Sequence, residues 1–337
     1  MPELRSPALI LFAALAFVPV PAMRPADAAT CQLTKVATLP VTVTPTNQVL
    51  IDGSIKGQPA KFQVDTGATD TTFDVSVFSR FGIANSGRQM RGVGATGEVS
   101  AIATDVPDLT IGNFRITSIY QVVLEKHFLP DGVYALFGED FFTAYDLDID
   151  FGNGALNLMQ YNSCNTEPIY WSDKFSEADI NVSRNKILVH VEINGTPAVA
   201  IFDTGASASV ISWALARRLG LDKDSPGMTV LGTVRGVDMH PMTAYGFRFS
   251  EIGVGDEVVK NPFLQIIDLS PVKYDTSSLA RIQDSNVQGY DALLGEDFIK
   301  AHHIYIATRQ GKMYFTYNGK GAIFPAPPKP PSSAHAP

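Results

Sequence analysis

The tetrapeptide Asp-Thr-Gly-Ala occurs twice in this chain, at residues 65–68 and again at residues 203–206. Sliding the sequence by 138 positions (203 − 65) aligns residues 49–83 with residues 187–221 without a gap. Outside the tetrapeptide, the aligned identical residues are Leu50, Ile55, Gly57, Pro59, Ala60, Arg80 and Gly82, which recur as Leu188, Ile193, Gly195, Pro197, Ala198, Arg218 and Gly220. A repeat of this length predicts two related lobes within one polypeptide.

A predicted β-hairpin precedes each copy of the tetrapeptide. In both lobes an apolar run leads into turn residues, Lys-Gly-Gln-Pro at 56–59 and Asn-Gly-Thr-Pro at 194–197, which fold the chain back on itself. The returning strands at 62–64 and 199–202 are apolar enough to be buried. Each aspartate is therefore expected to emerge from a hydrophobic interior at the end of a strand.

The residues after each aspartate predict a tight turn and then a short helix. Gly67 and Gly205 allow the backbone to approach a neighbour closely or to take a positive φ. Residues 73–81 and 211–219 have the pattern of short helices, and a glycine follows directly after each of them. We expect both helices to stop at that glycine.

A second motif is repeated further along each lobe, Ala-Leu-Phe-Gly-Glu-Asp-Phe-Phe at 135–142 and Ala-Leu-Leu-Gly-Glu-Asp-Phe-Ile at 292–299. Asp-Thr-Gly-Ala followed in the same lobe by two apolar residues, glycine and a short helix resembles the aspartic peptidases, particularly the retropepsin-like branch. The resemblance covers most of residues 45–320. It implies a mainly all-β fold, in which two homologous retropepsin-like lobes with short helices face each other across an active-site cleft.

The resemblance further implies that Asp65 and Asp203, one from each lobe, form the catalytic pair of an aspartic endopeptidase. Two adjacent carboxyls cannot both ionise cheaply, so they titrate as a unit and one keeps its proton. The ionised member can take a proton from a bound water while the protonated member polarises the scissile carbonyl, without a covalent intermediate. The sequence does not assign the proton to either aspartate. A lone Asp-Thr-Gly is more often a surface turn, but repetition after buried strands favours catalysis.

Supporting roles follow from the same resemblance. Thr66 and Thr204 would hydrogen-bond across the lobe interface and, together with Gly67 and Gly205, hold the two loops rigidly. The alternative is that each threonine caps only its own turn.

Paired acids follow the glycine of the second motif, Glu-Asp at 139–140 and at 296–297. Such pairs can be catalytic or can bind metal. We interpret them instead as helix starts, where each acid meets the positive end of the helix dipole, a contribution of about 0.3–1 kcal/mol. We predict no cofactor, and the adjacent pair His302-His303 lacks the spacing of metal ligands.

A glycine-rich stretch lies between the two motifs of each lobe, and its candidate substrate-binding residues are Gly92, Val93, Gly94, Gly236 and Val237. The position resembles the flap of the family, a hairpin that closes over bound peptide and excludes water. An ordinary glycine-rich hairpin is the alternative. Residues 92–97 also match a dinucleotide fingerprint, but the residues that follow alternate like a strand rather than a helix, which argues against a nucleotide site. Residues 90–98 contain no aromatic counterpart of the flap tyrosine of pepsin-like enzymes.

One departure from the pepsin-like pattern bears on pH. Pepsin-like enzymes commonly carry serine or threonine directly after Asp-Thr-Gly, whereas this chain has Ala68 and Ala206, which cannot donate a side-chain hydrogen bond. Fewer donors leave the carboxylate form less stabilised. We therefore predict a working range from mild acid to near neutrality.

Composition agrees with a secreted globular protein. The chain has 337 residues, 45% of them hydrophobic, which is enough for two lobes with substantial cores. Its net charge of −8, with no basic cluster, argues against nucleic acid as a partner. The expected partner is a polypeptide substrate in an extended conformation.

The N-terminus has the pattern of a secretory signal peptide at residues 1–28, with Arg5, an apolar stretch at 8–18 and Ala-Asp-Ala at 26–28. The apolar stretch is shorter than the about 20 residues that a membrane span needs, so no span is expected after cleavage. This pattern predicts a bacterial periplasmic or secreted protein. An uncleaved anchor and a lipoprotein modified at Cys31 are the less favoured alternatives.

Cys31 and Cys164 flank the first lobe, so a disulfide between them could tie its ends together in an oxidising compartment. Closing a loop of this size would be worth about 4–5 kcal/mol in the chain-entropy model. Two free thiols are the alternative. Neither cysteine lies near a histidine motif that would activate a thiol nucleophile.

The predicted organisation is a signal peptide, two lobes, a connection and a tail, at 1–28, 29–163, 164–180, 181–324 and 325–337. The tail is rich in proline and is expected to be disordered. Three functional hypotheses remain: a monomeric endopeptidase whose lobes pair within the chain, a catalytically inactive peptide-binding or scaffolding protein, and an obligate dimer whose lobes pair between chains. A short linker favours pairing within the chain through its high effective concentration.

Overall fold

Both copies of the repeat fold as the expected hairpin in a computed structural model of the chain, which describes residues 33–93, 98–160, 168–236, 239–269 and 290–327. The turns between the paired strands place two successive residues at positive φ, 51° and 72° at Lys56 and Gly57, and 46° and 77° at Asn194 and Gly195. Two positive φ angles in a two-residue loop match the right-handed twist of the flanking strands. The turn chemistry of the sequence therefore sets the register that delivers each aspartate.

Several of the predicted features lie outside the described residues. They are the signal peptide at 1–28, both cysteines of the possible disulfide, Cys31 and Cys164, and the flap residues Gly94 and Val237. The C-terminal tail is described only as far as residue 327.

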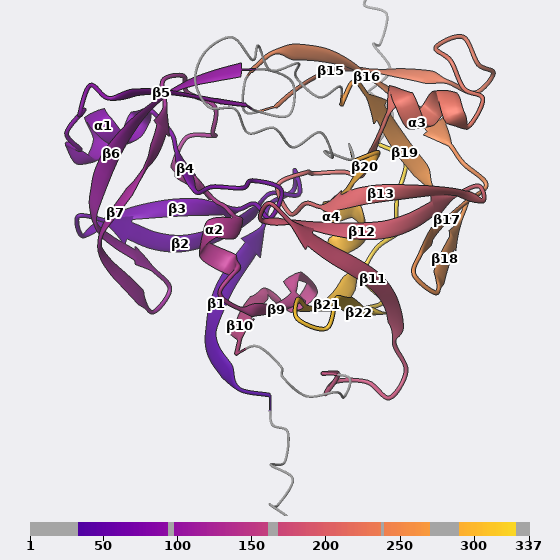
Figure 1. Cartoon of the computed structure of the whole chain (residues 1–337), viewed down its shortest axis with the longest axis horizontal. Helices are drawn as coiled ribbons and strands as arrows, with labels where there is room; N and C mark the ends of the chain where they lie inside the picture. Colours follow the sequence, from indigo (N-terminus) through magenta and orange to yellow (C-terminus); the bar gives the residue numbers. More distant parts are fainter. Residues whose placement is uncertain (1–32, 94–97, 161–167, 237–238, 270–289, 328–337) are drawn as a thin grey trace, which may run out of the picture. The chain divides into compact units, whose positions relative to one another are not determined.

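The fold is mainly β, and the two lobes divide its strands between them (Figure 1). The first lobe contains β1 (Lys35–Val43), β2 (Val49–Ile55), β3 (Gln58–Val64), β4 (Thr72–Phe73), β5 (Gln89–Val93), β6 (Glu98–Ile111), β7 (Phe114–Leu124), β8 (Val133–Phe137), β9 (Asp146–Asp150) and β10 (Ala155–Met159). The second lobe contains β11 (Ser176–Ser183), β12 (Lys186–Ile193), β13 (Thr196–Phe202), β14 (Val210–Ser212), β15 (Thr229–Arg235), β16 (Pro241–Arg248), β17 (Glu251–Val254), β18 (Glu257–Lys260), β19 (Phe263–Ile267), β20 (Ala292–Leu294), β21 (His302–Ala307) and β22 (Lys312–Tyr317).

The apolar strand of the second motif pairs in parallel with the strand that delivers the aspartate. In the first lobe β8 lies beside β3, and in the second lobe β20 lies beside β13. The backbone N–H of Asp65 donates to the carbonyl of Phe137 at 2.9 Å, and that of Asp203 donates to Leu294 at 3.0 Å. The two sequence motifs of each lobe therefore meet at the aspartate, as the resemblance implied.

An antiparallel sheet joins the lobes on the side opposite β5 and β15 (Figure 1). Its strands follow the order β1, β10, β9, β21, β22 and β11, and β9 of the first lobe pairs with β21 of the second. Ile149 lies opposite Ile304 in that central pair, and both side chains are fully buried. Strand β11 begins at Ser176, within the segment 164–180 that the sequence assigns to the connection.

The helices are short, and two of them begin later than the sequence indicates. Helix α1 (Ser76–Phe81) and helix α3 (Trp213–Arg218) start after β4 and β14, because the first residues of each expected helix pair with neighbouring strands instead. Helix α1 ends as predicted at Gly82, which has a φ of 59° in the left-handed region. Helix α2 (Glu139–Phe142) and helix α4 (Glu296–Ile299) begin at the paired acids, as predicted.

One hydrophobic core runs through both lobes and the sheet between them. Phe62 and Phe137 pack edge to face in the first lobe, with ring centroids 5.2 Å apart. This core fixes the two aspartate loops relative to each other, since both strands that carry them are anchored in it.

In the described part of the chain, no helix is both long enough and apolar enough to cross a membrane.

Candidate active site

Asp65 and Asp203 lie together where the two lobes meet. Each is only 9% exposed, and each follows a strand whose last residues are buried. A Cβ atom built on Gly67 would overlap with the carboxyl of Asp203, and one built on Gly205 would overlap with the carboxyl of Asp65. Glycine is therefore required in both loops because the carboxyl of the opposite lobe occupies the space that a side chain would need.

The two threonines hydrogen-bond across the lobes, as the resemblance implied, and do not merely cap their own turns. The Thr66 hydroxyl accepts from the backbone N–H of Thr204 at 3.1 Å and donates to the carbonyl of Phe202 at 2.8 Å. In the reciprocal pair, the Thr204 hydroxyl accepts from Thr66 N–H at 3.0 Å and donates to the carbonyl of Val64 at 3.1 Å. Both threonines are buried, so these four bonds lock the loops together.

Valine at either threonine position is expected to lower the free energy of unfolding by about 2–4 kcal/mol, because it leaves a buried N–H and a buried carbonyl of the other lobe without a partner. Urea unfolding of Thr66→Val and Thr204→Val measures this loss. Thr66→Ser keeps the hydroxyl and is the matched control, expected to lose less than half as much. Wild-type stability in both valine variants would show that the four bonds do not hold the lobes.

The two carboxyls have different hydrogen-bond donors. One oxygen of Asp203 accepts from the backbone N–H groups of Gly205 at 2.9 Å and Ala206 at 3.1 Å. One oxygen of Asp65 accepts from the N–H of Ala68 at 2.9 Å. Backbone donors stabilise the charged form of a carboxyl, so the arrangement favours ionisation of Asp203 over that of Asp65.

Burial changes the protonation of both aspartates. It is the main cause that raises the pKa of Asp65 to about 8, and the charge of Asp203 raises it further. Burial also raises the pKa of Asp203, against its two backbone donors. Two backbone donors on Asp203, against one on Asp65, favour Asp65 as the member of the pair that holds a proton.

The comparison with protein families agrees with this geometry. A family model described as aspartyl protease matches residues 51–141 and again residues 189–298, one match in each lobe. The chain belongs to the aspartyl protease family. Two retropepsin-like lobes are fused in it, and each match contains one aspartate of the pair. A comparison with curated protein sequences finds no significant match.

A lysine from the second lobe reaches the aspartate loop of the first in this aspartyl protease. Lys186, the first residue of β12, donates from its ammonium group to the carbonyl of Gly67. Its charge lowers the pKa of both Asp65 and Asp203. No motif in the sequence predicts this contact of Lys186. The only available signal was its place in the repeat, where the first lobe has Gln48.

Helices α2 and α4 each begin with an acid that is buried in this aspartyl protease. Glu139 is 3% exposed and Glu296 is fully buried, and within the described residues one carboxyl oxygen of Glu139 and both of Glu296 have no hydrogen-bond partner. Burial raises the pKa of Glu139 to about 8, where Lys186 lowers it and Asp65 raises it. Burial also raises the pKa of Glu296. The interpretation as helix starts is right for the position of these acids but does not account for their burial.

The second acid of each pair holds the motif strand to the aspartate loop. Asp140 accepts from the hydroxyl of Thr71 at 2.7 Å and from its N–H at 2.8 Å. Asp297 accepts in the same way from Ser209, at 2.6 Å and 2.8 Å. The same two hydroxyls receive the N–H of the glycine that ends each motif strand. These contacts give both aspartates of the second motif a structural role.

Both stretches that were predicted to be flaps form hairpins, β5 with β6 and β15 with β16, which fits a flap and an ordinary hairpin equally. Gly92 and Val93 belong to β5, and Gly236 follows β15 directly, so the described flap residues lie at or near the hairpin tips. The unusual backbone in the second flap is at Gly232, which has a φ of 117° beside a shift in register. This strand bulge lies four residues before Gly236.

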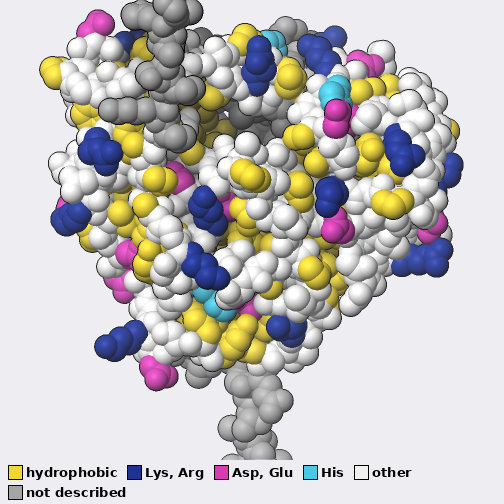
Figure 2. Space-filling model, turned by 180° about the vertical axis from the view of Figure 1, so that it is seen from behind, with side chains coloured by type: hydrophobic (Ala, Val, Ile, Leu, Met, Phe, Trp, Pro, Cys, Tyr) yellow, Lys and Arg dark blue, Asp and Glu magenta, His cyan; other side chains and the backbone are white. Residues whose placement is uncertain are grey.

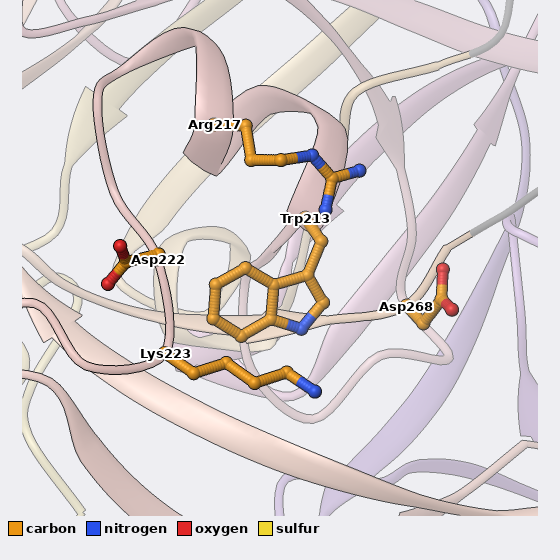
Figure 3. Close-up of a pocket in the computed structure, with 5 residues that line it drawn as sticks. All are labelled: Trp213, Arg217, Asp222, Lys223 and Asp268. Atoms are coloured by element: carbon orange, nitrogen blue, oxygen red, sulfur yellow. The ribbon is translucent and has the colours of Figure 1, made fainter.

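A pocket with a volume of about 240 Å³ is lined by other residues than the aspartate pair. Figure 3 shows four of its lining residues, Arg217, Asp222, Lys223 and Asp268, around the indole of the fifth, Trp213. The Lys223 ammonium lies 5.9 Å from the centre of the Trp213 ring. None of these residues belongs to the loops, flaps or motif strands that make up the candidate site, so the pocket does not extend it.

Proposed function

We propose that the protein is an aspartic endopeptidase in which Asp65 and Asp203 activate a water molecule to hydrolyse peptide bonds. The observation that carries the proposal is the close approach of the two carboxyls, each packed against the glycine of the opposite loop. Their unequal donors support distinct roles, with Asp65 as the acid and Asp203 as the base. A pair with one proton can supply both functions at the same pH.

In each of the two steps of the reaction, the aspartate pair accepts one proton and donates one proton. The Asp203 carboxylate takes a proton from water as the water oxygen bonds to the scissile carbonyl carbon, while Asp65 gives its proton to the carbonyl oxygen. The resulting tetrahedral diol collapses when the carbon–nitrogen bond breaks, Asp203 gives its proton to the leaving nitrogen, and Asp65 takes back the hydroxyl proton. No covalent bond to the enzyme forms at any step.

A peptide would enter between the lobes beneath the two flaps. Figure 2 shows the surface hollowed between the lobes, on the side where Figure 1 labels β5 and β15. The flaps would cover an extended polypeptide there and exclude water from the carboxyl pair. We also propose that the protein works as a monomer in the bacterial periplasm or after secretion, with the pair formed inside one chain. Light scattering of the purified protein tests the monomer.

The pH dependence of cleavage is expected to have an upper limit near pH 8. Asp65 must hold the shared proton, and its pKa is raised to about 8, so activity falls as the pH rises through that value. Activity is also expected to fall in strong acid, because Asp203 must be ionised. The measurement is kcat/KM of one peptide substrate between pH 3 and pH 9. A sharp maximum below pH 3 would contradict the assigned roles.

Cleavage of a diverse peptide library by the wild-type protein between pH 3 and pH 8 tests the proposed function. We expect cleavage within extended peptides, blocked by a statine-type compound that mimics the tetrahedral intermediate. Absence of cleavage at every pH by folded protein, together with tight binding of the same compound, would favour an inactive peptide-binding protein instead.

A further inference from the structure

The cation beside the aspartate pair breaks the symmetry of the two lobes. Lys186 extends from β12 of the second lobe and donates to the Gly67 carbonyl in the loop of the first lobe. At the equivalent place in the repeat the first lobe has Gln48, whose amide donates instead to Gln63 of its own lobe at 3.4 Å. The repeat position that carries an ammonium group in the second lobe therefore carries an uncharged amide in the first.

The charge of this ammonium group acts on four carboxyls in other segments of the chain. They are Asp65 and Asp203 of the pair, Asp70 just after the first loop, and Glu139 at the start of α2. Lys186 lowers the pKa of all four carboxyls, and burial raises the pKa of each. Asp140 adds a further negative charge beside Asp70 and Glu139. The ammonium thus partly offsets a cluster of acids that burial would otherwise keep protonated.

We propose that Lys186 is a positioning residue that holds the Gly67 loop and sets the pH range in which the aspartate pair carries a single proton. This inference rests on the proposed function, since it concerns the same site. The cause is electrostatic. A nearby cation favours the ionised form of a carboxyl, so it keeps Asp203 ionised to lower pH and releases the proton of Asp65 at lower pH than burial alone would.

Without the ammonium charge both carboxyls hold protons more strongly, so the acid limb and the alkaline limb of the pH profile both move to higher pH. A unit charge at the range of a neighbouring side chain corresponds to a shift of about one pH unit. Lys186→Gln, which copies the residue of the first lobe, is expected to shift both limbs upward by about that amount.

The test compares kcat/KM between pH 3 and pH 9 for the wild type, Lys186→Gln and Lys186→Arg. Arginine keeps the charge and can still donate to the Gly67 carbonyl, so it is expected to restore the wild-type limbs. Lys61→Gln is the matched control, since Lys61 is half-exposed and pairs with Asp52 on the outer face of the first lobe. A lower rate at every pH with unmoved limbs would reduce Lys186 to a structural contact and overturn the proposal.

A second readout does not depend on catalysis. In protein labelled with ¹³C at the aspartate carboxyls, the titration of Asp65 and Asp203 is expected to move upward by about one unit in Lys186→Gln and to stay in place in Lys186→Arg. If the protein does not cleave peptides but the titration moves, the proposed function fails while the role of Lys186 stands. If the protein cleaves peptides and neither readout moves, the role of Lys186 fails alone.

Discussion

Asparagine in place of either aspartate of the pair is expected to reduce kcat for peptide cleavage by about 10⁴-fold, since the two carboxyls act as one unit and neither can be both acid and base. Asparagine has the size of aspartate, and its side-chain oxygen can keep the hydrogen bond from Ala68 at position 65 or from Gly205 at position 203. The loss should therefore appear in the rate and not in the fold. Steady-state cleavage by Asp65→Asn and Asp203→Asn measures it.

Two controls separate a shared pair from a general disturbance. Asp52→Asn, on the exposed face of β2, is expected to cleave at the wild-type rate. The double variant should be no slower than either single variant, because removing one member already disables the unit.

Mixing the two single variants should restore no cleavage if the lobes pair within one chain. Recovery on mixing would indicate pairs formed between chains, and cleavage by either single variant at more than a tenth of the wild-type rate would rule out the shared pair.

The free energy of unfolding is expected to fall by about 5–7 kcal/mol between pH 5 and pH 7.5. Burial raises the pKa of Asp65 and of Glu139 to about 8 in the folded protein, so both hold protons that the unfolded chain has released. Their stabilising contribution is complete below the ordinary carboxyl pKa and is lost as the pH rises toward 8. Each such group lowers the free energy of unfolding by about 1.4 kcal/mol per pH unit in that window. Urea unfolding across this range measures the slope.

The buried glutamates account for a defined part of that slope. Glu139→Gln places a permanently neutral group at this site, so it is expected to leave the free energy of unfolding at pH 5 nearly unchanged and to raise it by about 2–3 kcal/mol at pH 7.5. Glu296→Gln is expected to change it in the same direction, since burial also raises the pKa of Glu296. Glu192→Gln, at an exposed position on β12, is the matched control and should match the wild type at both pH values. A wild-type slope in both buried variants would mean that these glutamates ionise in the folded protein.

Much of the fold and the aspartate pair could be predicted because the sequence states the same plan twice. The turns at Lys56-Gly57 and Asn194-Gly195 specify hairpins locally, and a strand that follows such a turn must end at the aspartate. The start of α1 was predicted three residues too early, since Phe73 also suits a helix and only its pairing with β7 and β8 places it in a strand. Boundaries of this kind depend on neighbours that are distant in the sequence.

The electrostatic surroundings of the pair could not be predicted for the same reason. Lys186 begins a strand 119 residues after Gly67, and nothing near either residue indicates that they meet. Glu139 reads as an exposed first-turn acid, but its N–H donates to the carbonyl of Ala68 at 2.9 Å, which places the side chain beside the aspartate loop and out of solvent. The repeat itself could have drawn attention to the glutamates, because Glu296 occupies the same place after the same glycine.

The most direct test of the pairing of Asp65 with Asp203 is the titration of the aspartate carboxyls in the wild-type protein, observed by ¹³C NMR between pH 2 and pH 10. We expect the two residues to titrate together in two well-separated steps, with the upper step near pH 8, and each Asn variant to show the loss of one step. Two independent titrations near the ordinary pKa of aspartate, each unaffected by the asparagine at the other position, would contradict a shared proton and with it the proposed mechanism.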